Sequence, residues 1–335
     1  MHIYKKEPER RDVELAKNSV SALNSALKKE LGNLKDPKMI LWAGDFHLHQ
    51  SGPYQKEVDR KYEKIDCSRQ LELCLEEINA LQVEPIAVIL GGDITDNSFR
   101  GEWMEFKRLI EKTGFNKPTI PLFGNHEHAF SMDAKVMDSI WMDIGISSWI
   151  RIEDPNEYFY SVVFDDYKLI ILDSVNSTGD MMSDAQRSFL RDEVMDSSLN
   201  ILIFQHKHIM PALNWLDEGI YRDKGMVDII DSSGKVLGVF SGHTHKTSLW
   251  RYRDKLYGSF PAVCYGIGDR TGWGGIILDQ GKIVKIFTKD ICTESYEDCS
   301  GFSLQQGSFR FLESEDFENS PLLNPEFWCR RSHLG

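Results

Sequence analysis

The sequence predicts an α/β fold with a sheet that is at least partly parallel. Short apolar runs recur along the chain and each ends in a polar loop, as in KMILWAGD, PIAVILGGD, PTIPLFGNH, LNILIFQHKH and VLGVFSGHTH. Stretches with helical periodicity lie between the first three of these runs. Strands that alternate with helices in this way are typical of βαβ units, whose strands are parallel.

The individual elements follow from periodicity and from turn residues. Residues 8–32 are predicted to form one amphipathic helix, which Gly32 and Asn33 end. Helices are also predicted for CSRQLELCLEEINALQ and EWMEFKRLIEKTG, before the second and third strands. YFYSVVFDD and KLIILDS are predicted to form a hairpin that turns at Asp165 and Asp166. After VLGVFSGHTH the pattern changes to antiparallel strands, so the chain is mainly β-structure towards its end.

Three regions are predicted along the chain. Residues 1–36 form an N-terminal helical extension, residues 37–290 form the main domain, and residues 291–335 form a C-terminal segment. The C-terminal segment lacks periodicity and is acidic, which is compatible with a flexible tail. Its aromatic residues favour packing onto the core instead; they are Phe302, Phe309, Phe311, Phe317, Phe327 and Trp328.

Composition narrows the class of protein. The chain has 335 residues, 41% of them hydrophobic, with a formal net charge of −13. This size permits a large buried core, and the negative charge argues against binding to nucleic acid or to anionic membranes. No apolar run is long enough for a transmembrane helix, and the charged N-terminus does not resemble a signal peptide. The six cysteines have no CxxC spacing, so we expect reduced thiols in a cytoplasmic protein of unknown oligomeric state.

Histidines are distributed very unevenly. Eight of the ten lie in four His-x-His pairs, which are His47/His49, His126/His128, His206/His208 and His243/His245. Random placement would produce roughly 0.3 such pairs. Because histidine is the commonest metal ligand and titrates near neutral pH, the clustering indicates a chemical site.

Each candidate ligand follows an apolar strand. The candidates lie just after five predicted strands. They are, in chain order, Asp45 and His47; Asp93; Asn125 and His126; His206; and His243 and His245. The carboxyl ends of strands in open α/β sheets form the crevice in which ligands bind. This inventory holds seven metal-ligand candidates and one further histidine, enough for two divalent ions that share a carboxylate. Mixed Asp, Asn and His ligation suits Mn, Fe or Zn better than Ca or Mg.

The ordered motifs resemble those of the calcineurin-like metallophosphoesterases. They are D-x-H (Asp45, His47), GGDITD (Asp93, Asp96), GNHE (Asn125, His126), His206 and GHTH (His243, His245), and the resemblance covers roughly residues 39–290. It implies a four-layer α/β/β/α sandwich of two mixed sheets flanked by helices. It also implies hydrolysis of phosphate esters at a dinuclear centre with a metal-bridging hydroxide as nucleophile.

The resemblance assigns a role to each residue. The first metal would be held by Asp45, His47 and His245, and the second by Asn125, His206 and His243. Asp93 would bridge the two metals. His126 would act as general acid to the leaving oxygen, and Asp96 would orient it by a hydrogen bond. We expect Glu127 and Asp173 to be structural. His49, His128 and His208 match no ligand position, so they lie in an outer shell or meet the substrate.

The substrate is less well defined by the sequence. GGDITDN and GNHE resemble the cyclic-nucleotide phosphodiesterase branch more than the protein phosphatases, which favours a small phosphodiester. Asn97 stands where relatives that act on phosphoproteins often have arginine, which weakens that substrate class. The alternatives are a phosphomonoesterase for nucleotides or sugar phosphates, a nuclease, which the net charge disfavours, and a non-catalytic scaffold.

Overall fold

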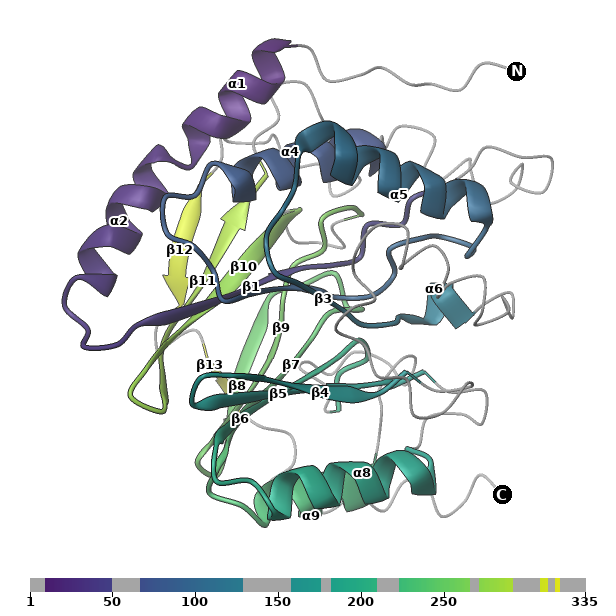
Figure 1. Cartoon of the computed structure of the whole chain (residues 1–335), viewed down its shortest axis with the longest axis vertical. Coiled ribbons are helices and arrows are strands. Elements are labelled where there is room, and N and C mark those ends of the chain that lie inside the picture. Colours follow the sequence, from purple (N-terminus) through teal and green to yellow (C-terminus); the bar gives the residue numbers. More distant parts are fainter. Residues whose placement is uncertain are drawn as a thin grey trace.

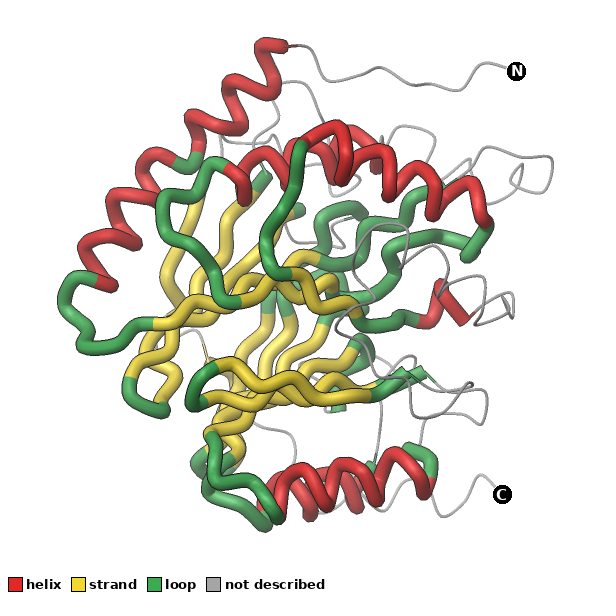
Figure 2. Tube along the Cα trace, viewed as in Figure 1, coloured by secondary structure: helices red, strands yellow, loops and turns green. Residues whose placement is uncertain are grey.

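The computed structural model has four layers, with two sheets packed face to face and helices on both outer surfaces (Figures 1 and 2). It describes residues 10–49, 67–128, 158–175, 182–209, 223–265, 271–291, 308–312 and 317–319. The predicted four-layer α/β/β/α sandwich of two mixed sheets is therefore confirmed. Among the described helices, none is long and apolar enough to cross a membrane.

The first sheet contains the strands expected from the N-terminal half. Its order is β12 (Phe309–Leu312), β11 (Lys282–Asp290), β10 (Gly272–Asp279), β1 (Lys38–Ala43), β2 (Ala87–Leu90) and β3 (Thr119–Pro121). β1, β2 and β3 are parallel to one another, whereas β10, β11 and β12 pair antiparallel. The predicted βαβ units therefore account for only half of this sheet.

The second sheet is built from the middle of the chain. Its order is β13 (Phe317–Asn319), β8 (Ser248–Tyr252), β9 (Lys255–Ser259), β7 (Val236–Ser241), β6 (Asn200–Gln205), β5 (Tyr167–Leu172) and β4 (Tyr160–Phe164). β5, β6, β7 and β9 are parallel to one another, β4 runs antiparallel to β5, and β8 runs antiparallel to β9 and parallel to β13. The hairpin predicted at Asp165 and Asp166 is present as the β4–β5 connection.

Burial on both faces explains why the strands are continuous apolar runs. In β1, Met39 and Leu41 pack with the helices, whereas Ile40 and Trp42 pack against the second sheet. The same alternation holds in β2 and leaves no polar face. Trp42 fills the space between the sheets and stacks on Phe260 at a centroid distance of 5.7 Å.

Four helices cover the first sheet (Figure 1): α1 (Arg10–Ser19), α2 (Ser21–Leu31), α4 (Cys67–Asn79) and α5 (Arg100–Thr113). The prediction of one helix over 8–32 was wrong, because α1 and α2 are separate and Val20 lies between them. The Ser19 hydroxyl donates to the carbonyl of Ala16 and to Glu77 of α4. Serine hydroxyls that compete for backbone carbonyls disfavour the interior of a helix, which accounts for the break.

A buried ion pair joins the helical layer to the sheet beneath it. Glu77 and Lys289 are both fully buried, with Lys289 Nζ 3.2 Å from Glu77 Oε1. Trp273 Nε1 donates to the other carboxylate oxygen at 2.8 Å. Because an unpaired buried charge is very costly, this pair holds α4 in one position over β10 and β11.

The opposite face is covered by α8 (Asp184–Met195) and α9 (Lys224–Asp231), which lie below the second sheet in Figure 1. Both begin at a capping side chain, Ser183 and Asp223 respectively, which accepts a backbone N–H of the first turn. Of the C-terminal segment, the described residues add one edge strand to each sheet, β12 beside β11 and β13 beside β8.

Candidate metal centre

The predicted site residues converge from five loops that follow strands of both sheets. β1 leads to Asp45 and His47, β2 to Asp93, β6 to His206, and β7 to His243 and His245. Asn125 and His126 lie in α6 (Asn125–His128), a single turn that follows β3. Three groups of side chains lie close enough to hold a metal ion: Asp45/His47/His245, His47/Asp93/His126 and Asp93/His206/His243.

The backbone of these loops is held in an uncommon conformation. Five of the converging residues have positive φ: Asp45 (54°), His47 (46°), Asp93 (47°), His243 (67°) and His245 (56°). Aspartate and histidine tolerate this left-handed region better than most residues, but it still costs about 1–3 kcal/mol at each position. Strain of this kind clusters at functional sites, and here it turns successive side chains towards one point.

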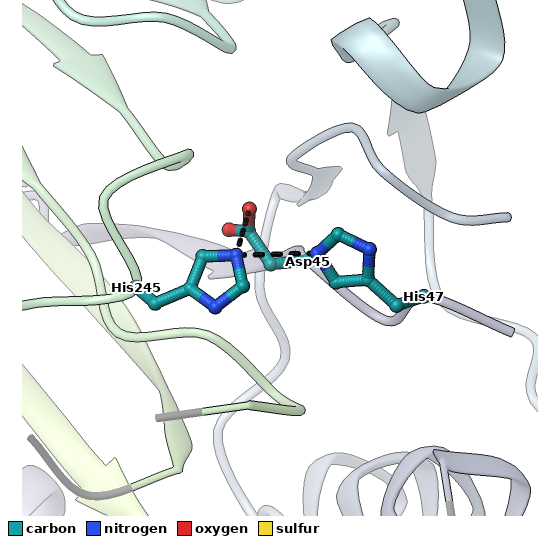
Figure 3. A group of neighbouring side chains, drawn as sticks. All are labelled: Asp45, His47 and His245. Carbon is teal, nitrogen blue, oxygen red and sulfur yellow. Dashed lines mark hydrogen bonds and ion pairs between the residues drawn. The ribbon is translucent and has the colours of Figure 1, made fainter. Parts of the chain in front are cut away.

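The first group brings one carboxylate and two imidazoles together (Figure 3). His47 Nε2 and His245 Nε2 are 3.2 Å apart, and His245 Nε2 is 3.4 Å from Asp45 Oδ1. His245 Nδ1 faces the carbonyl of Tyr265 at 2.6 Å, which leaves Nε2 as the atom directed into the group. A backbone carbonyl that fixes the outer nitrogen in this way is usual for a metal-binding histidine.

A second candidate metal site is formed by Asp93, His206 and His243, together with Asn125. His206 Nε2 lies 3.2 Å from Asp93 Oδ2 without a well-directed hydrogen bond, and His206 Nδ1 faces the Gly91 carbonyl at 2.8 Å. The Asn125 side-chain oxygen is also buried, and neither it nor His206 Nε2 has a hydrogen-bond partner among the described residues. Unsatisfied buried acceptors and donors are rare, so these two atoms fit a divalent ion.

Asp93 lies between the two groups. Its Oδ2 is 3.2 Å from His206 Nε2, 3.7 Å from His47 Nε2 and 3.9 Å from His126 Nε2. The carboxylate is almost fully buried, which would favour its neutral form, but the neighbouring His206 keeps the pKa of Asp93 well below its usual value. A buried carboxylate shared by both groups is the arrangement that two adjacent cations require.

The protonation of the ligand histidines differs across the site. Burial lowers the pKa of His243 and of His245, so both imidazoles are neutral and able to donate a lone pair. For His206, burial opposes protonation, but the charge of Asp93 raises the pKa to about 9. A metal ion bound at His206 would have to displace this proton, which would make metal affinity dependent on pH.

His126 lies beside Asp96, which also contacts His47. His126 Nδ1 lies 3.3 Å from Asp96 Oδ1 and faces the Asp96 carbonyl at 2.6 Å. The same Oδ1 is 3.3 Å from His47 Nδ1, so one carboxylate contacts both histidines. Burial opposes protonation of His126, but the hydrogen bond to Asp96 and the charge of Asp93 raise its pKa to about 10. His126 can therefore carry a proton at neutral pH.

Glu127 is a structural residue, as expected, but its contacts are more extensive than the sequence indicated. Its buried carboxylate accepts the N–H groups of Asp93 (2.8 Å), Thr95 (3.0 Å) and Gly124 (2.8 Å). The Thr95 hydroxyl adds a fourth hydrogen bond at 3.1 Å. Glu127 thus ties the loop after β2 to the loop after β3, and thereby fixes Asp93 beside Asn125.

Gly124 shows how closely these two loops approach. A Cβ atom at this position would lie 2.1 Å from Asp93 Oδ1 and 2.5 Å from the Asp93 nitrogen. Both atoms belong to the residue at the centre of the site, so no side chain fits between the loops. The glycine of GNHE is therefore required by the approach of Asp93.

The three remaining histidines have different surroundings. His128 Nε2 lies 3.1 Å from Asp173 Oδ2 at the end of β5. His208 is buried, has no described partner for Nδ1, and has its pKa lowered to about 4 by burial. His49 is exposed, and its Nδ1 lies 3.4 Å from the His47 carbonyl. None of the three belongs to a metal-binding group among the described residues.

Comparison with known proteins agrees with this geometry. The family model for calcineurin-like phosphoesterases matches residues 38–247. The chain therefore belongs to the calcineurin-like phosphoesterases and is a hydrolase of phosphate esters. The family depends on a dinuclear metal centre, and the clustered Asp and His groups of this chain are compatible with one.

Relatives have been described as phosphodiesterases. A probable glycerophosphodiester phosphodiesterase from Arcobacter nitrofigilis is 25% identical over 224 residues, which cover 63% of this chain and 74% of that protein. A probable cyclic nucleotide phosphodiesterase from Xenorhabdus bovienii is 24% identical over 217 residues, covering 62% and 81%. Among solved structures, a dimetal phosphatase from Danio rerio has the same fold, with a TM-score of 0.56 at 12% identity, over 76% of this chain and 96% of that one.

Proposed function

We propose that this protein hydrolyses a small phosphodiester at a centre of two divalent ions. The observation that carries the proposal is the position of Asp93 between two groups of candidate ligands, each of which holds imidazoles that are neutral or can lose a proton. Asp45, His47 and His245 would hold one ion, Asn125, His206 and His243 the other, and Asp93 would contact both. Mn, Fe and Zn suit this set of ligands.

The ions would supply positive charge for the phosphoryl oxygens and would lower the pKa of a water molecule to roughly 7 when bound. The side chains of the protein would supply the proton for the leaving group. Protonated His126, held by Asp96, would donate its Nε2 proton to the leaving oxygen. General acids of this kind contribute about 10²–10⁴-fold to the rate.

The names of the relatives support a diester substrate. Glycerophosphodiesters and cyclic nucleotides share one feature, a phosphate esterified at two oxygens. One ester oxygen must leave as an alcohol, which makes a proton donor such as His126 useful. Hydrolysis of a phosphomonoester remains the alternative, and the same assay separates the two.

The test compares bis-p-nitrophenyl phosphate with p-nitrophenyl phosphate, using protein loaded separately with Mn²⁺, Fe²⁺ and Zn²⁺. We expect faster hydrolysis of the diester and a loss of about 10²–10⁴-fold in His126→Ala. Glycerophosphodiesters and cyclic nucleotides would then be compared as substrates. Faster hydrolysis of the monoester would favour the alternative, and protein that binds two ions yet acts on no ester would overturn the proposal.

The role of Asp93 can be tested without measuring activity. Asp93→Ala should lose both ions by elemental analysis, whereas Asp45→Ala should mainly lose one. Asp228→Ala is a matched control, because Asp228 is exposed on α9 and pairs only with Lys224 among the interactions described. Unchanged metal content in Asp93→Ala would exclude the bridging role.

A further inference from the structure

Two buried cysteines from distant parts of the chain meet beside the first metal group. Cys67 is the first residue of α4, and Cys264 lies in the loop after β9. Cys264 Sγ is 3.9 Å from the Cys67 carbonyl oxygen, and the Cys67 thiol interacts electrostatically with the side chains of Cys264, His49 and Tyr265. The Cys264 thiol therefore lies beside Cys67 in the reduced protein.

The Cys264 segment is attached directly to the first metal group. The Cys264 nitrogen donates to the Asp45 carbonyl at 3.1 Å, and Val263 donates to Gly44 at 3.0 Å. The next residue, Tyr265, accepts from His245 Nδ1 and has its ring 5.3 Å from that of His47. A movement of Cys264 would thus be transmitted to all three members of this group.

The environment of Cys67 favours the thiolate, the form of cysteine that reacts with oxidants. The side chains of Cys264, His49 and Tyr265 lie near its sulfur and stabilise the negative charge. These contacts outweigh its burial and lower the pKa of the thiol. Cys74 on the same helix is the opposite case, because burial and Glu77 raise its pKa well above the usual value.

We propose that Cys67 and Cys264 form a peroxide-sensitive pair, and that their disulfide weakens the first metal site. In the first step the Cys67 thiolate attacks a hydroperoxide, the O–O bond breaks, and hydroxide or alkoxide leaves. In the second step the Cys264 sulfur attacks the sulfenic acid and expels water. Together, two thiols are oxidised to one disulfide, and hydrogen peroxide is reduced to two water molecules.

The consequence for the metal follows from the geometry of a disulfide. Its sulfurs lie about 2.05 Å apart, much closer than two thiols in van der Waals contact. Closing this gap draws the Cys264 backbone towards α4 and away from Asp45, or strains the Tyr265 carbonyl that orients His245. This part of the inference rests on the proposed function, in which Asp45, His47 and His245 hold one ion.

The test uses the full chain loaded with Zn²⁺, which has no redox chemistry of its own. The protein is treated with hydrogen peroxide, then digested and mapped by mass spectrometry under non-reducing conditions. We expect a cross-linked peptide containing Cys67 and Cys264, with a mass lower by two hydrogens. Elemental analysis should show loss of about one of two zinc ions, and dithiothreitol followed by fresh Zn²⁺ should restore it.

Three variants provide the controls. Cys67→Ser and Cys264→Ser should keep their zinc under peroxide, whereas Cys74→Ser should behave like the wild type because its thiol lies outside the pair. Wild-type protein in which both thiols survive peroxide, or in which Cys67 pairs with another cysteine, would overturn the proposal. So would a Cys67–Cys264 disulfide that leaves the zinc content unchanged. Neither mass mapping nor zinc analysis depends on phosphoesterase activity, so the proposed function can fail separately.

Discussion

Asp96 contacts both the proposed general acid, His126, and a proposed metal ligand, His47. Its Oδ1 lies 3.3 Å from Nδ1 of both His126 and His47. The family resemblance implied the contact with His126. It did not predict the contact with His47, because nothing in the spacing of D-x-H indicates where that ring turns.

Asp96→Asn should move the alkaline limb of the pH–rate profile to lower pH. His126 must be protonated to act as an acid, so activity is lost as pH rises through its pKa. Asp96 raises that pKa, and removing its charge lowers it. We expect kcat to fall by about 10–100-fold, less than in His126→Ala, because the Asp96 carbonyl still accepts from Nδ1. An alkaline limb that stays in place would contradict the assigned role of Asp96.

Glu127→Gln should weaken metal binding by about 10–100-fold. An amide offers one acceptor oxygen, so it must leave at least one of the three backbone N–H groups facing another donor. The Asp93 loop then loses its attachment to the loop after β3. The measurement is zinc affinity by competition with a chelator, alongside the thermal unfolding midpoint.

Glu102→Gln is the matched control for Glu127. Glu102 is equally buried and accepts the backbone N–H groups of Asn97 and Phe99 at the start of α5. We expect it to lower stability with little change in zinc affinity. If the two variants lost zinc equally, Glu127 would have only a general structural role.

At the scale of elements, the short helix α6 is held between the two sheets. Glu127 attaches it to the loop after β2, and His128 attaches it to Asp173 at the end of β5. Asp173 in turn accepts the backbone N–H groups of Tyr158 and Val175. A turn of four residues has little stability of its own, so these contacts determine where Asn125 and His126 lie.

The His128–Asp173 contact should make stability depend on pH. Burial opposes protonation of His128, but Asp173 raises its pKa above the ordinary value. Its contribution is therefore complete below about pH 6.5, the pKa of an unperturbed histidine, and is lost as pH rises through the higher pKa of the folded protein. In metal-free protein, His128→Asn should cost on the order of 1 kcal/mol at acid pH and less at alkaline pH.

Urea unfolding of wild type and His128→Asn across this pH range measures the difference. Asp173→Asn and the double variant complete a double-mutant cycle, which isolates the coupling from the effect of each side chain alone. A difference in unfolding free energy that did not change with pH would mean that the pair contributes without a charge on His128.

At the scale of the whole molecule, the N-terminal helices share a core with the first sheet. Leu23 and Leu27 of α2 are fully buried in the same cluster as Leu71 of α4 and Met39 of β1. The boundary predicted at residue 36 remains a prediction, but α2 packs into the core rather than standing apart from it. The strands β12 and β13 likewise join the C-terminal segment to both sheets.

Leu27→Ala should therefore destabilise the entire fold by about 2–5 kcal/mol, as large-to-small changes in a packed core do. Ser25→Ala, on the exposed side of the same helix, should change stability by about 0.5 kcal/mol or less. Both are measured by chemical unfolding with the active-site metals removed. If Leu27→Ala unfolded the helix in a separate, earlier transition, α2 would be an independent extension.

The amino-acid sequence indicated the candidate ligands and most of the local elements. The apolar runs predicted the strands because burial on both faces removes polar alternation. Asp45, Asp93, Asn125 and the histidine pairs were evident as candidate ligands because only a few residue types can bind a metal ion. Local spacing also predicted the hairpin at Asp165. It failed at Val20, where the Ser19 hydroxyl competes for the Ala16 carbonyl and also contacts Glu77 of α4.

Only the tertiary structure decided how these parts meet. Several pairs of residues that are distant in sequence lie together, and no periodicity links their positions. They are Glu127 with Asp93, His128 with Asp173, and Cys67 with Cys264. They form because two sheets pack face to face and bring the ends of their strands to one place. The physical reason is that local sequence governs local hydrogen bonding and burial, whereas the geometry of a site depends on how separate strands and helices pack.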